Sequence, residues 1–416
     1  MRFFPFILFL LCFLAGCGDG KPAAPVAVVK EADGFYIWQR ARPEALATAL
    51  AAEPSEARFC YLSRELENWR TTPVACPESR LPKQAFVPVF RIHVLPEMEK
   101  ALQAGRLQAW VLAELAAVRT EFQKRQIPLA ELQLDLDCPE RLLSDYGRFL
   151  KGLRPKLGGL RLSVTVLPCH LDRQAFRQVA SACDEFILQV HGIEGPGTPE
   201  HPATLMKLPV ALAAIKQATA LGRPFRVALP AYGSRLVFSK KDGRFKGIAS
   251  EEAAELPEAE CRWQLCVPRP DEVLAVRQAA LASPSCRGIL WFRLPVLGDR
   301  LCWDRGTIRS LQENRLPVVG MKIRWEQRND GSSELIVFNH GDLETAQATI
   351  TIGWGQDRTH EYGLRPGTIP AGDAGIPGIV PVSLRFPVPP PGQSRPIAWF
   401  RLGKMVPPEI KSDRSD

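Results

Sequence analysis

The sequence lacks the short motifs that mark several common classes of enzyme. It has no glycine-rich turn after an early strand, no P-loop and no Gly-x-Ser-x-Gly elbow, which argues against dinucleotide sites, nucleotide sites and that type of serine hydrolase. It also has no Cys-x-x-Cys, His-x-His or His-x-x-x-His, so we expect no metal site and no cofactor. The net charge is +8 but Lys and Arg form no block, so we expect no nucleic-acid partner.

A long apolar run is missing after Gly18, while a short one precedes it. Residues 3–14 are almost wholly apolar but too few to span a bilayer, and Leu14-Ala15-Gly16-Cys17 resembles a bacterial lipobox. This resemblance implies a signal peptide over 1–16, acylation of Cys17 and a lipid-anchored linker over 17–30. The alternative is an ordinary secretory signal in which Cys17 is incidental. Because Gly18 is not an aspartate, the family's sorting rule implies the periplasmic face of the outer membrane rather than the inner membrane.

Nine cysteines follow Cys17, an odd number that leaves at least one thiol outside any disulfide. An exported protein can form disulfides. We expect Cys261 and Cys266, close together in a predicted loop, to be the best pair.

Between residues 31 and 317, strand and helix patterns alternate, which predicts a parallel sheet. Eight repeats in under three hundred residues fit an α/β fold of the (β/α)8 TIM-barrel type, with an open doubly wound sheet as the alternative. The predicted strands are 35–39, 58–66, 86–94, 132–137, 161–167, 185–190, 225–230 and 288–294, and the clearest helices are 107–126, 139–153, 203–220 and 304–313.

After Pro317 the helical period disappears and turn signals separate short strands. We expect a C-terminal all-β sandwich over 318–404, with a disordered tail over 405–416. Its predicted strands are 321–327, 333–339, 346–354, 380–386 and 397–402. Before the eighth barrel strand, Asp242-Gly243 predicts a hairpin between 236–238 and 245–248.

The fourth barrel strand alternates leucines with polar residues. Gln133, Asp135 and Asp137 share the face that should enter the barrel, near the end where TIM-barrel enzymes place their chemistry. These carboxylates either form a site or are structural and held by arginines, because an interior carboxylate is costly unless it is paired.

The same alternation on the other strands places further polar and aromatic side chains at this end of the barrel. This combination suits polyhydroxylated ligands. We therefore expect a substrate-binding set of Trp38, Tyr61, Arg91, His93, Gln189, His191, Tyr232, Trp291 and Arg293.

Several strand ends resemble those of chitinase-type glycoside hydrolases. Residues 184–191 resemble their Asp-Tyr-x-x-x-Met-x-Tyr segment, Pro230-Ala231-Tyr232-Gly233 matches their Pro-x-Tyr-Gly, and Trp291 lies where they keep a floor tryptophan. In their Asp-x-x-Asp-x-Asp-x-Glu motif the last two aspartates match Asp135 and Asp137. The first aspartate falls on Leu132, and the proton-donating Glu falls on Pro139.

The resemblance therefore implies a glycoside-hydrolase-like barrel that lacks the standard acid. Asp135 and Asp137 are the candidate catalytic residues, with Glu65 or Glu140 as an alternative acid. The whole chain also resembles a bacterial lipoprotein family described as a domain of unknown function, through its lipobox, Trp38-Gln39-Arg40 and Leu134–Pro139.

Three functions remain open at this point. The chain is expected to be an envelope lipoprotein, attached to the membrane through Cys17, whose barrel hydrolyses a polysaccharide with displaced catalytic residues. Alternatively, the barrel binds a glycan without cleaving it, or the lipoprotein is a scaffold whose C-terminal sandwich binds a protein partner.

Overall fold

The computed structural model describes most of the chain after residue 27. The described residues are 28–39, 43–78, 85–95, 97–193, 203–249, 260–297, 299, 301–318, 320–342, 347–353, 359–370, 382–402 and 409–413. The predicted signal peptide and Cys17 lie outside them. Among these residues, no helix has both the length and the apolar character needed to cross a bilayer.

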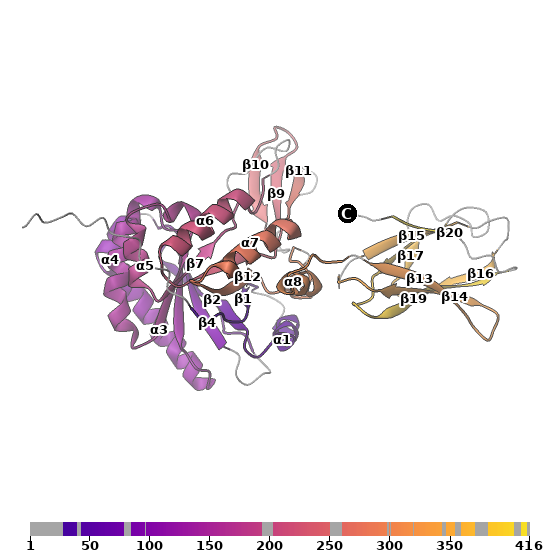
Figure 1. The fold of residues 1–416 in the computed structure, drawn as a ribbon, viewed down its shortest axis with the longest axis horizontal. Coiled ribbons are helices and arrows are strands. Elements are labelled where there is room, and N and C mark those ends of the chain that lie inside the picture. Colours follow the sequence, from indigo (N-terminus) through magenta and orange to yellow (C-terminus); the bar gives the residue numbers. More distant parts are fainter. Residues whose placement is uncertain are drawn as a thin grey trace, which may run out of the picture.

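Eight parallel strands form a closed barrel (Figure 1), because β1 pairs with both β2 and β12 and so joins the two ends of the sheet. The predicted TIM barrel is thus confirmed, and the open-sheet alternative is excluded. The barrel strands are β1 (Gly34–Ile37), β2 (Arg58–Glu67), β4 (Ala85–Ile92), β5 (Glu131–Leu136), β6 (Arg161–Val166), β7 (Glu185–Gln189), β8 (Phe225–Pro230) and β12 (Cys286–Phe292).

Helices surround the barrel and connect most successive strands. The exception is the connection from β2 to β4, where the short antiparallel strand β3 (Arg70–Pro73) pairs with β2 and no helix occurs among the described residues. The helices are α1 (Pro43–Ala51), α2 (Met98–Gln103), α3 (Arg106–Lys124), α4 (Leu143–Leu153), α5 (Phe176–Ala182), α6 (Leu208–Ala220), α7 (Pro270–Ala282) and α8 (Arg305–Gln312).

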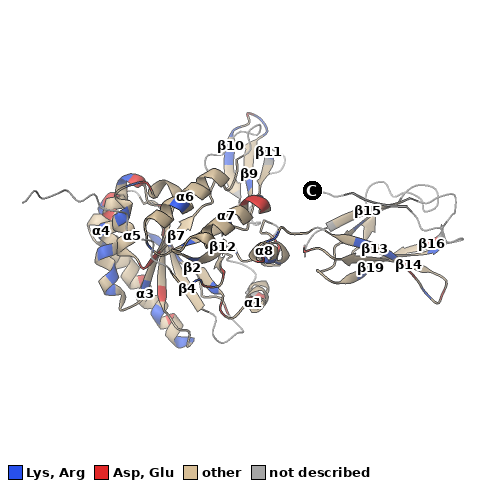
Figure 2. Cartoon of the chain, in the orientation of Figure 1, with Lys and Arg blue, Asp and Glu red and all other residues tan. Residues whose placement is uncertain are grey.

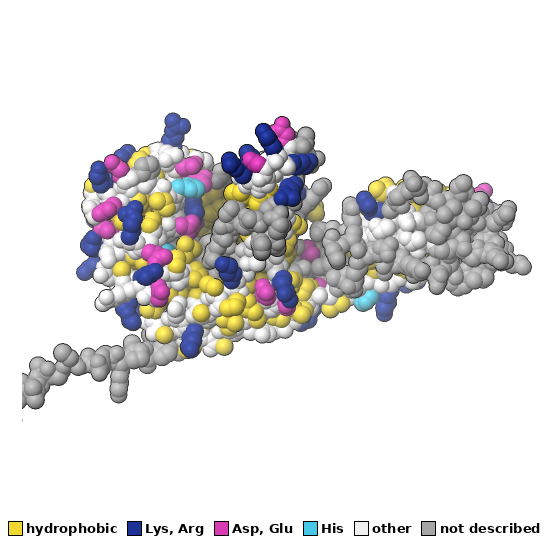
Figure 3. All heavy atoms as spheres, turned by 90° about the horizontal axis from the view of Figure 1, so that it is seen from above, with side chains coloured by type: hydrophobic (Ala, Val, Ile, Leu, Met, Phe, Trp, Pro, Cys, Tyr) yellow, Lys and Arg dark blue, Asp and Glu magenta, His cyan; other side chains and the backbone are white. Residues whose placement is uncertain are grey.

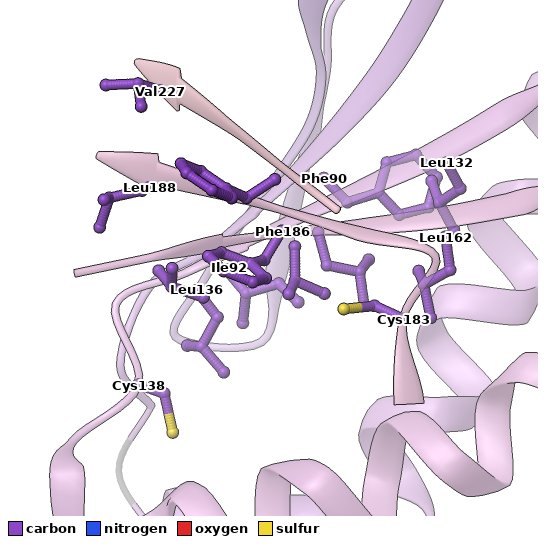
Figure 4. Close-up of a cluster of buried hydrophobic side chains, with 14 of the residues drawn as sticks. Phe90, Ile92, Leu132, Leu136, Cys138, Leu162, Cys183, Phe186, Leu188 and Val227 are labelled. Carbon is purple, nitrogen blue, oxygen red and sulfur yellow. The ribbon is translucent and has the colours of Figure 1, made fainter. Parts of the chain in front are cut away.

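Alternation along the strands divides the apolar side chains into two cores. The larger core lies between the strands and the helices, and Figure 4 shows a part of it with side chains such as Phe90, Leu132, Leu162 and Phe186. A smaller core fills the middle of the lumen and is built on Tyr36, Cys60, Val87, Val89, Ile187, Ala228 and Leu290.

The amino-terminal end of the lumen, here called the base, is closed by buried ion pairs. The Glu185 carboxylate lies 2.9 Å from Arg58, 3.2 Å from Arg226 and 3.3 Å from Arg161. Arg58 also pairs with Glu131, which accepts a hydrogen bond of 2.5 Å from Ser163. Burial alone would raise the pKa of Glu185, but the surrounding arginines, Arg58 first, lower it.

The segment between β8 and α7 projects from the barrel as a three-stranded antiparallel sheet (Figure 1). The predicted hairpin is confirmed as β9 (Ser234–Ser239) and β10 (Phe245–Ala249), and β11 (Cys261–Cys266) pairs with the other edge of β9. The predicted disulfide is wrong: Cys261 and Cys266 are free and begin and end β11, so about 16 Å of extended strand separates them. All nine cysteines after Cys17 are free.

Two antiparallel sheets follow the barrel and share one core (Figure 1), which confirms the sandwich. One sheet has the order β13-β14-β19-β16 and the other β17-β18-β15-β20. The strands are β13 (Met321–Gln327), β14 (Ser333–Asn339), β15 (Gln347–Gly353), β16 (Thr359–Leu364), β17 (Ile369–Pro370), β18 (Val382–Pro387), β19 (Ser394–Leu402) and β20 (Glu409–Asp413).

β20 lies within the segment that was expected to be a disordered tail, and it pairs with β15. The prediction of disorder is therefore wrong for residues 409–413. Ile410 is the only apolar residue of Glu409–Asp413, so the sequence has no alternation there that would predict a strand.

Candidate functional site

The carboxyl-terminal ends of the barrel strands form the mouth of the barrel. Figure 3 shows a hollow on this side of the molecule, with acidic, basic and histidine side chains along its edge. Alternation brings Arg91 from β4 and Asp135 from β5 to the lumen, because the two residues are partners in the parallel register. Asp137 follows β5 on the same face.

One arginine holds both aspartates. Arg91 donates hydrogen bonds of 2.9 Å to Asp135 and 2.7 Å to Asp137. Burial, followed by the negative charge of Asp137, outweighs Arg91 and raises the pKa of Asp135. One oxygen of each aspartate is used by Arg91, whereas the other, Oδ1 in both cases, is buried and accepts no hydrogen bond from the described residues. Each aspartate thus retains an acceptor for an external donor.

Glu65 and His93 form a second polar pair beside the aspartates, with His93 Nε2 2.9 Å from Glu65 Oε1. Glu65 reaches the lumen because β2 carries a bulge between Leu62 and Arg64. The extra residue reverses the alternation, so Tyr61 points outward and Glu65 inward. The prediction that Tyr61 lines the site is therefore wrong: its ring is buried against Phe86 and Phe122 in the outer core.

The other wall of the mouth is aromatic. The ring of Phe292 lies 5.3 Å from that of Trp38, 5.3 Å from His191 and 5.2 Å from Tyr232. Trp38 and Phe292 are partly exposed, so their faces are available to a ligand. Gln189 also ends on the lumen side, where its side-chain amide donates to the His191 carbonyl at 3.1 Å.

His191 is neutral near pH 7, because burial lowers its pKa to about 3 although the charge of Asp137 acts in the opposite direction. Its Nδ1 lies 3.5 Å from the Tyr232 hydroxyl, and its Nε2 is buried without a hydrogen bond to any residue that the structure describes. His191 therefore presents a neutral ring nitrogen to the mouth.

Two predicted site residues, Trp291 on β12 and Arg293 just after it, occupy other positions. Trp291 is fully buried in the outer core and donates to Asp33 at 3.0 Å, while its neighbour Phe292 takes the lumen position. The run Gly288–Phe292 is continuously apolar, so alternation gave no signal there and the assignment of Trp291 was wrong. Arg293 is buried and its guanidinium pairs with Asp299 at 2.7 Å, so its charge is already neutralised.

Sequence reasoning missed Phe292 and Tyr36 as parts of the site. Tyr36 lies in the lumen, where its hydroxyl accepts a hydrogen bond of 2.6 Å from Gln133. Its alternation with Trp38 on the first strand was a usable signal. Among the described residues, no group of three or more His, Cys, Asp or Glu side chains is placed to hold a metal ion.

Glu140, the alternative acid, does not belong to the mouth cluster. It begins a short 3-10 helix after Pro139, and its carboxylate pairs with Arg173 at 2.5 Å on the surface. Glu140 therefore points away from the mouth, and the structure does not support it as the alternative acid.

Solved structures with similar barrels include three chitin- or cortex-lytic enzymes. The chain is 14% identical to the spore cortex-lytic enzyme SleL of Bacillus cereus, covering 69% of this chain and 75% of SleL with a TM-score of 0.47. It is 8% identical to a chitinase of Bacteroides thetaiotaomicron (64% and 90% covered, TM-score 0.44). It is 13% identical to the Cycas revoluta chitinase in complex with (GlcNAc)3 (63% and 94% covered, TM-score 0.39). Such distant likenesses bear on the fold alone.

The sequence comparisons give one match. No curated protein sequence matches this chain. Residues 98–297, which run from α2 to the end of β12 and include Asp135, Asp137, His191 and Phe292, are similar to the family described as "Domain of unknown function (DUF3142)".

Proposed function

We propose that the mouth of the barrel binds a glycan and does not cleave it by the chitinase-type mechanism. This proposal rests on one observation: buried acceptor atoms without hydrogen bonds lie in the same mouth as a wall of aromatic rings. Asp135 Oδ1, Asp137 Oδ1 and His191 Nε2 lack hydrogen bonds among the described residues, and sugar hydroxyls are donors that would satisfy them. Trp38 and Phe292 offer ring faces to the apolar face of a sugar.

Binding is favoured over standard hydrolysis because the acid is missing. Glycoside hydrolysis needs a carboxylic acid that protonates the leaving oxygen. Pro139 occupies the position of that acid, Glu140 is engaged by Arg173, and Arg91 holds both aspartates. A charged guanidinium beside two carboxylates stabilises their ionised form rather than a proton donor.

One observation favours a second candidate, a hydrolase with displaced catalytic groups. The pKa of Asp135 is raised despite Arg91, which is a property expected of a proton-donating carboxyl. In this candidate Asp135 or Glu65 supplies the proton, and the side chain of Asp137 lies beside the developing positive charge.

Titration with chito-oligosaccharides, monitored by calorimetry and by release of reducing ends, separates the two candidates. We expect binding without new reducing ends. Asp137→Asn should weaken binding by a factor of about 10 to 100, because it removes a charge-assisted hydrogen bond. Glu140→Gln is the matched control and should leave affinity unchanged. Release of reducing ends that Asp135→Asn abolishes would favour the hydrolase, and no binding at all would refute both candidates for this class of glycan.

We also propose that the protein is an envelope lipoprotein acylated at Cys17 and held at the outer membrane. The support is the Leu14–Cys17 sequence, since only a cysteine thiol can form the thioether. Cys17→Ser should leave an unprocessed or soluble protein, visible by mass spectrometry and fractionation. Unchanged mass and unchanged membrane association would contradict the anchor.

A further inference from the structure

A basic cavity lies at the base of the barrel, at the opposite end from the mouth. It measures about 470 Å³ and lies beside the amino-terminal end of β6. Its lining residues are Lys151, Arg154, Pro155, Gly159, Leu160, Arg161, Ser181, Ala182 and Asp184. Figure 2 shows basic segments on this α4 side of the barrel.

The one acidic residue in the lining is already engaged. Asp184 accepts a hydrogen bond of 2.5 Å from Arg154 and one of 2.8 Å from the backbone amide of Leu162. Lys151 and the nearby Lys156 are exposed and form no ion pair with described residues. The cavity and its edge therefore keep an excess of positive charge.

Arg161 also has unused hydrogen-bonding capacity. Its Nη2 lies 3.3 Å from Glu185 but is buried and makes no hydrogen bond within the described parts of the chain. The edge of the cavity beside it is open, because Gly158 and Gly159 turn with φ of +60° and +84° and a Cβ at Gly159 would meet no atom within 4 Å. The Arg161 side chain as a whole is 38% exposed at this edge, so its positive charge adds to that of the cavity rim.

The amino-terminal segment reaches the barrel at this same end. The Val28 amide donates to the Pro284 carbonyl at 3.0 Å, and Glu31 pairs with Arg226, which in turn contacts Glu185 and thereby Arg161. Cys17 precedes Val28 by eleven residues, a length that spans at most about 40 Å when fully extended. An anchor at Cys17 would therefore be joined to the barrel at its base.

We propose that the basic cavity and the adjacent Lys156 dock the base of the barrel on an anionic phospholipid surface, so that the mouth faces away from the membrane. Basic side chains near such a surface are attracted to its negative charge, and an acyl chain together with a basic patch forms a stable two-part anchor. The cavity is open and is flanked by exposed lysines, which suits a sheet of headgroups better than one enclosed phosphate. This proposal goes beyond glycan binding and rests on the anchor proposed at Cys17.

The test places the full acylated chain in phosphatidylcholine vesicles with and without phosphatidylglycerol, after mass spectrometry verifies the anchor. Amide hydrogen exchange of residues 154–161 should slow by a factor of about three or more when phosphatidylglycerol is present. A fluorophore on Cys169, the cysteine that is exposed and follows β6 at the mouth end, should show weaker energy transfer to a membrane acceptor in the same vesicles.

The double variant Lys151→Glu/Lys156→Glu should lose both effects, while Arg154 and Arg161 are left unchanged because they pair with Asp184 and Glu185. Lys100→Glu/Lys216→Glu changes the same charge at exposed positions on α2 and α6 and should behave like the unmodified protein. Glycan binding at the mouth, measured in parallel, should persist in both variants and thus reports the other proposal separately.

Equal exchange in the two kinds of vesicle would overturn the proposal. So would an equal loss in the control variant, or a protein without an acyl group at Cys17. Equal protection of residues 154–161 by inorganic phosphate in the absence of vesicles would also overturn it, since it would identify a site for soluble ions.

Discussion

The two ends of the barrel lumen both carry carboxylates beside arginines, but the balance between them differs. At the base, three arginines surround one carboxylate: Glu185 lies within ion-pair distance of Arg58, Arg161 and Arg226. At the mouth, Asp135 and Asp137 share Arg91. The pKa of Glu185 is lowered, whereas burial and a neighbouring charge raise that of Asp135.

This difference separates a structural ion-pair cluster from a site. Where cations outnumber the carboxylates, each carboxylate is held in its charged form and closes the lumen. Where carboxylates outnumber the cation, a ligand can supply donors to Oδ1 of Asp135 and Asp137. At the base, Glu185 Oε2 also lacks a hydrogen bond, but it lies 3.3 Å from Arg161 and 3.6 Å from Arg287. The same pair of residue types thus has two roles, decided by their ratio and by their exposure.

The largest expected effect tests the base. Glu185→Gln keeps the shape of the side chain but removes the carboxylate shared by Arg58, Arg161 and Arg226, and it leaves the fully buried Arg226 with Glu31 as its remaining charged partner, so the free energy of unfolding should fall by about 3–5 kcal/mol. Asp137→Asn is the matched change at the mouth and should cost about 1 kcal/mol or less. Urea unfolding measures both. Equal losses would show that the mouth aspartates are structural after all.

The pH dependence of stability should distinguish His191 at the mouth from the base. The pKa of His191 is about 3 in the folded protein and about 6.5 when unfolded, so only the unfolded chain binds a proton between these values. The free energy of unfolding should therefore fall as the pH drops from 6.5 toward 3, by up to about 1.4 kcal/mol per pH unit.

His191→Gln should flatten that slope between pH 6.5 and 4.5, a window above the ordinary pKa of Glu185 and therefore insensitive to the base. Thermal or urea unfolding of both proteins across this window provides the measurement. Parallel slopes for the two proteins would mean that His191 is protonated in the fold.

Smaller effects should distinguish Trp38 from Trp291, the two tryptophans that the sequence analysis assigned to the site. Trp38→Ala removes a partly exposed ring beside Phe292 and should weaken glycan binding by about 1 kcal/mol with little change in stability. Trp291→Phe deletes the hydrogen bond to Asp33 within the outer core, so it should lower stability by about 1 kcal/mol and leave affinity unchanged. Calorimetric titration and urea unfolding of the two variants measure these effects, and the opposite pattern would restore Trp291 to the site.

The sequence was sufficient to predict the barrel, the sandwich and the polar faces of β4, β5 and β7. β5 alternates leucines with Gln133 and Asp135, so its inward positions follow from a period of two. Arg91 and Gln189 are single polar residues near the ends of the mostly apolar strands β4 and β7. The assignment of inward side chains failed at the β2 bulge, where the alternation is broken, and along the apolar run of β12, where there is none.

The base was missed for a different reason. Arg58, Glu131, Glu185 and Arg226 each lie at or next to the start of a strand, where a charged residue is ordinarily read as part of a solvated turn. Only closure of the sheet brings these side chains together, because they come from strands up to about 170 residues apart along the chain, and such long-range contacts leave no local pattern.

The bulge in β2 reverses the alternation of inward and outward side chains along the strand. Side chains before Ser63 and side chains after it alternate in opposite phase. Cys60 and Glu65 therefore both face the lumen, although they are five positions apart. Deletion of Ser63 would restore a regular ladder and keep Glu65 paired with Arg91 on the lumen side. The extra residue is therefore what allows Tyr61 and Glu65, four positions apart, to face opposite sides of the same strand.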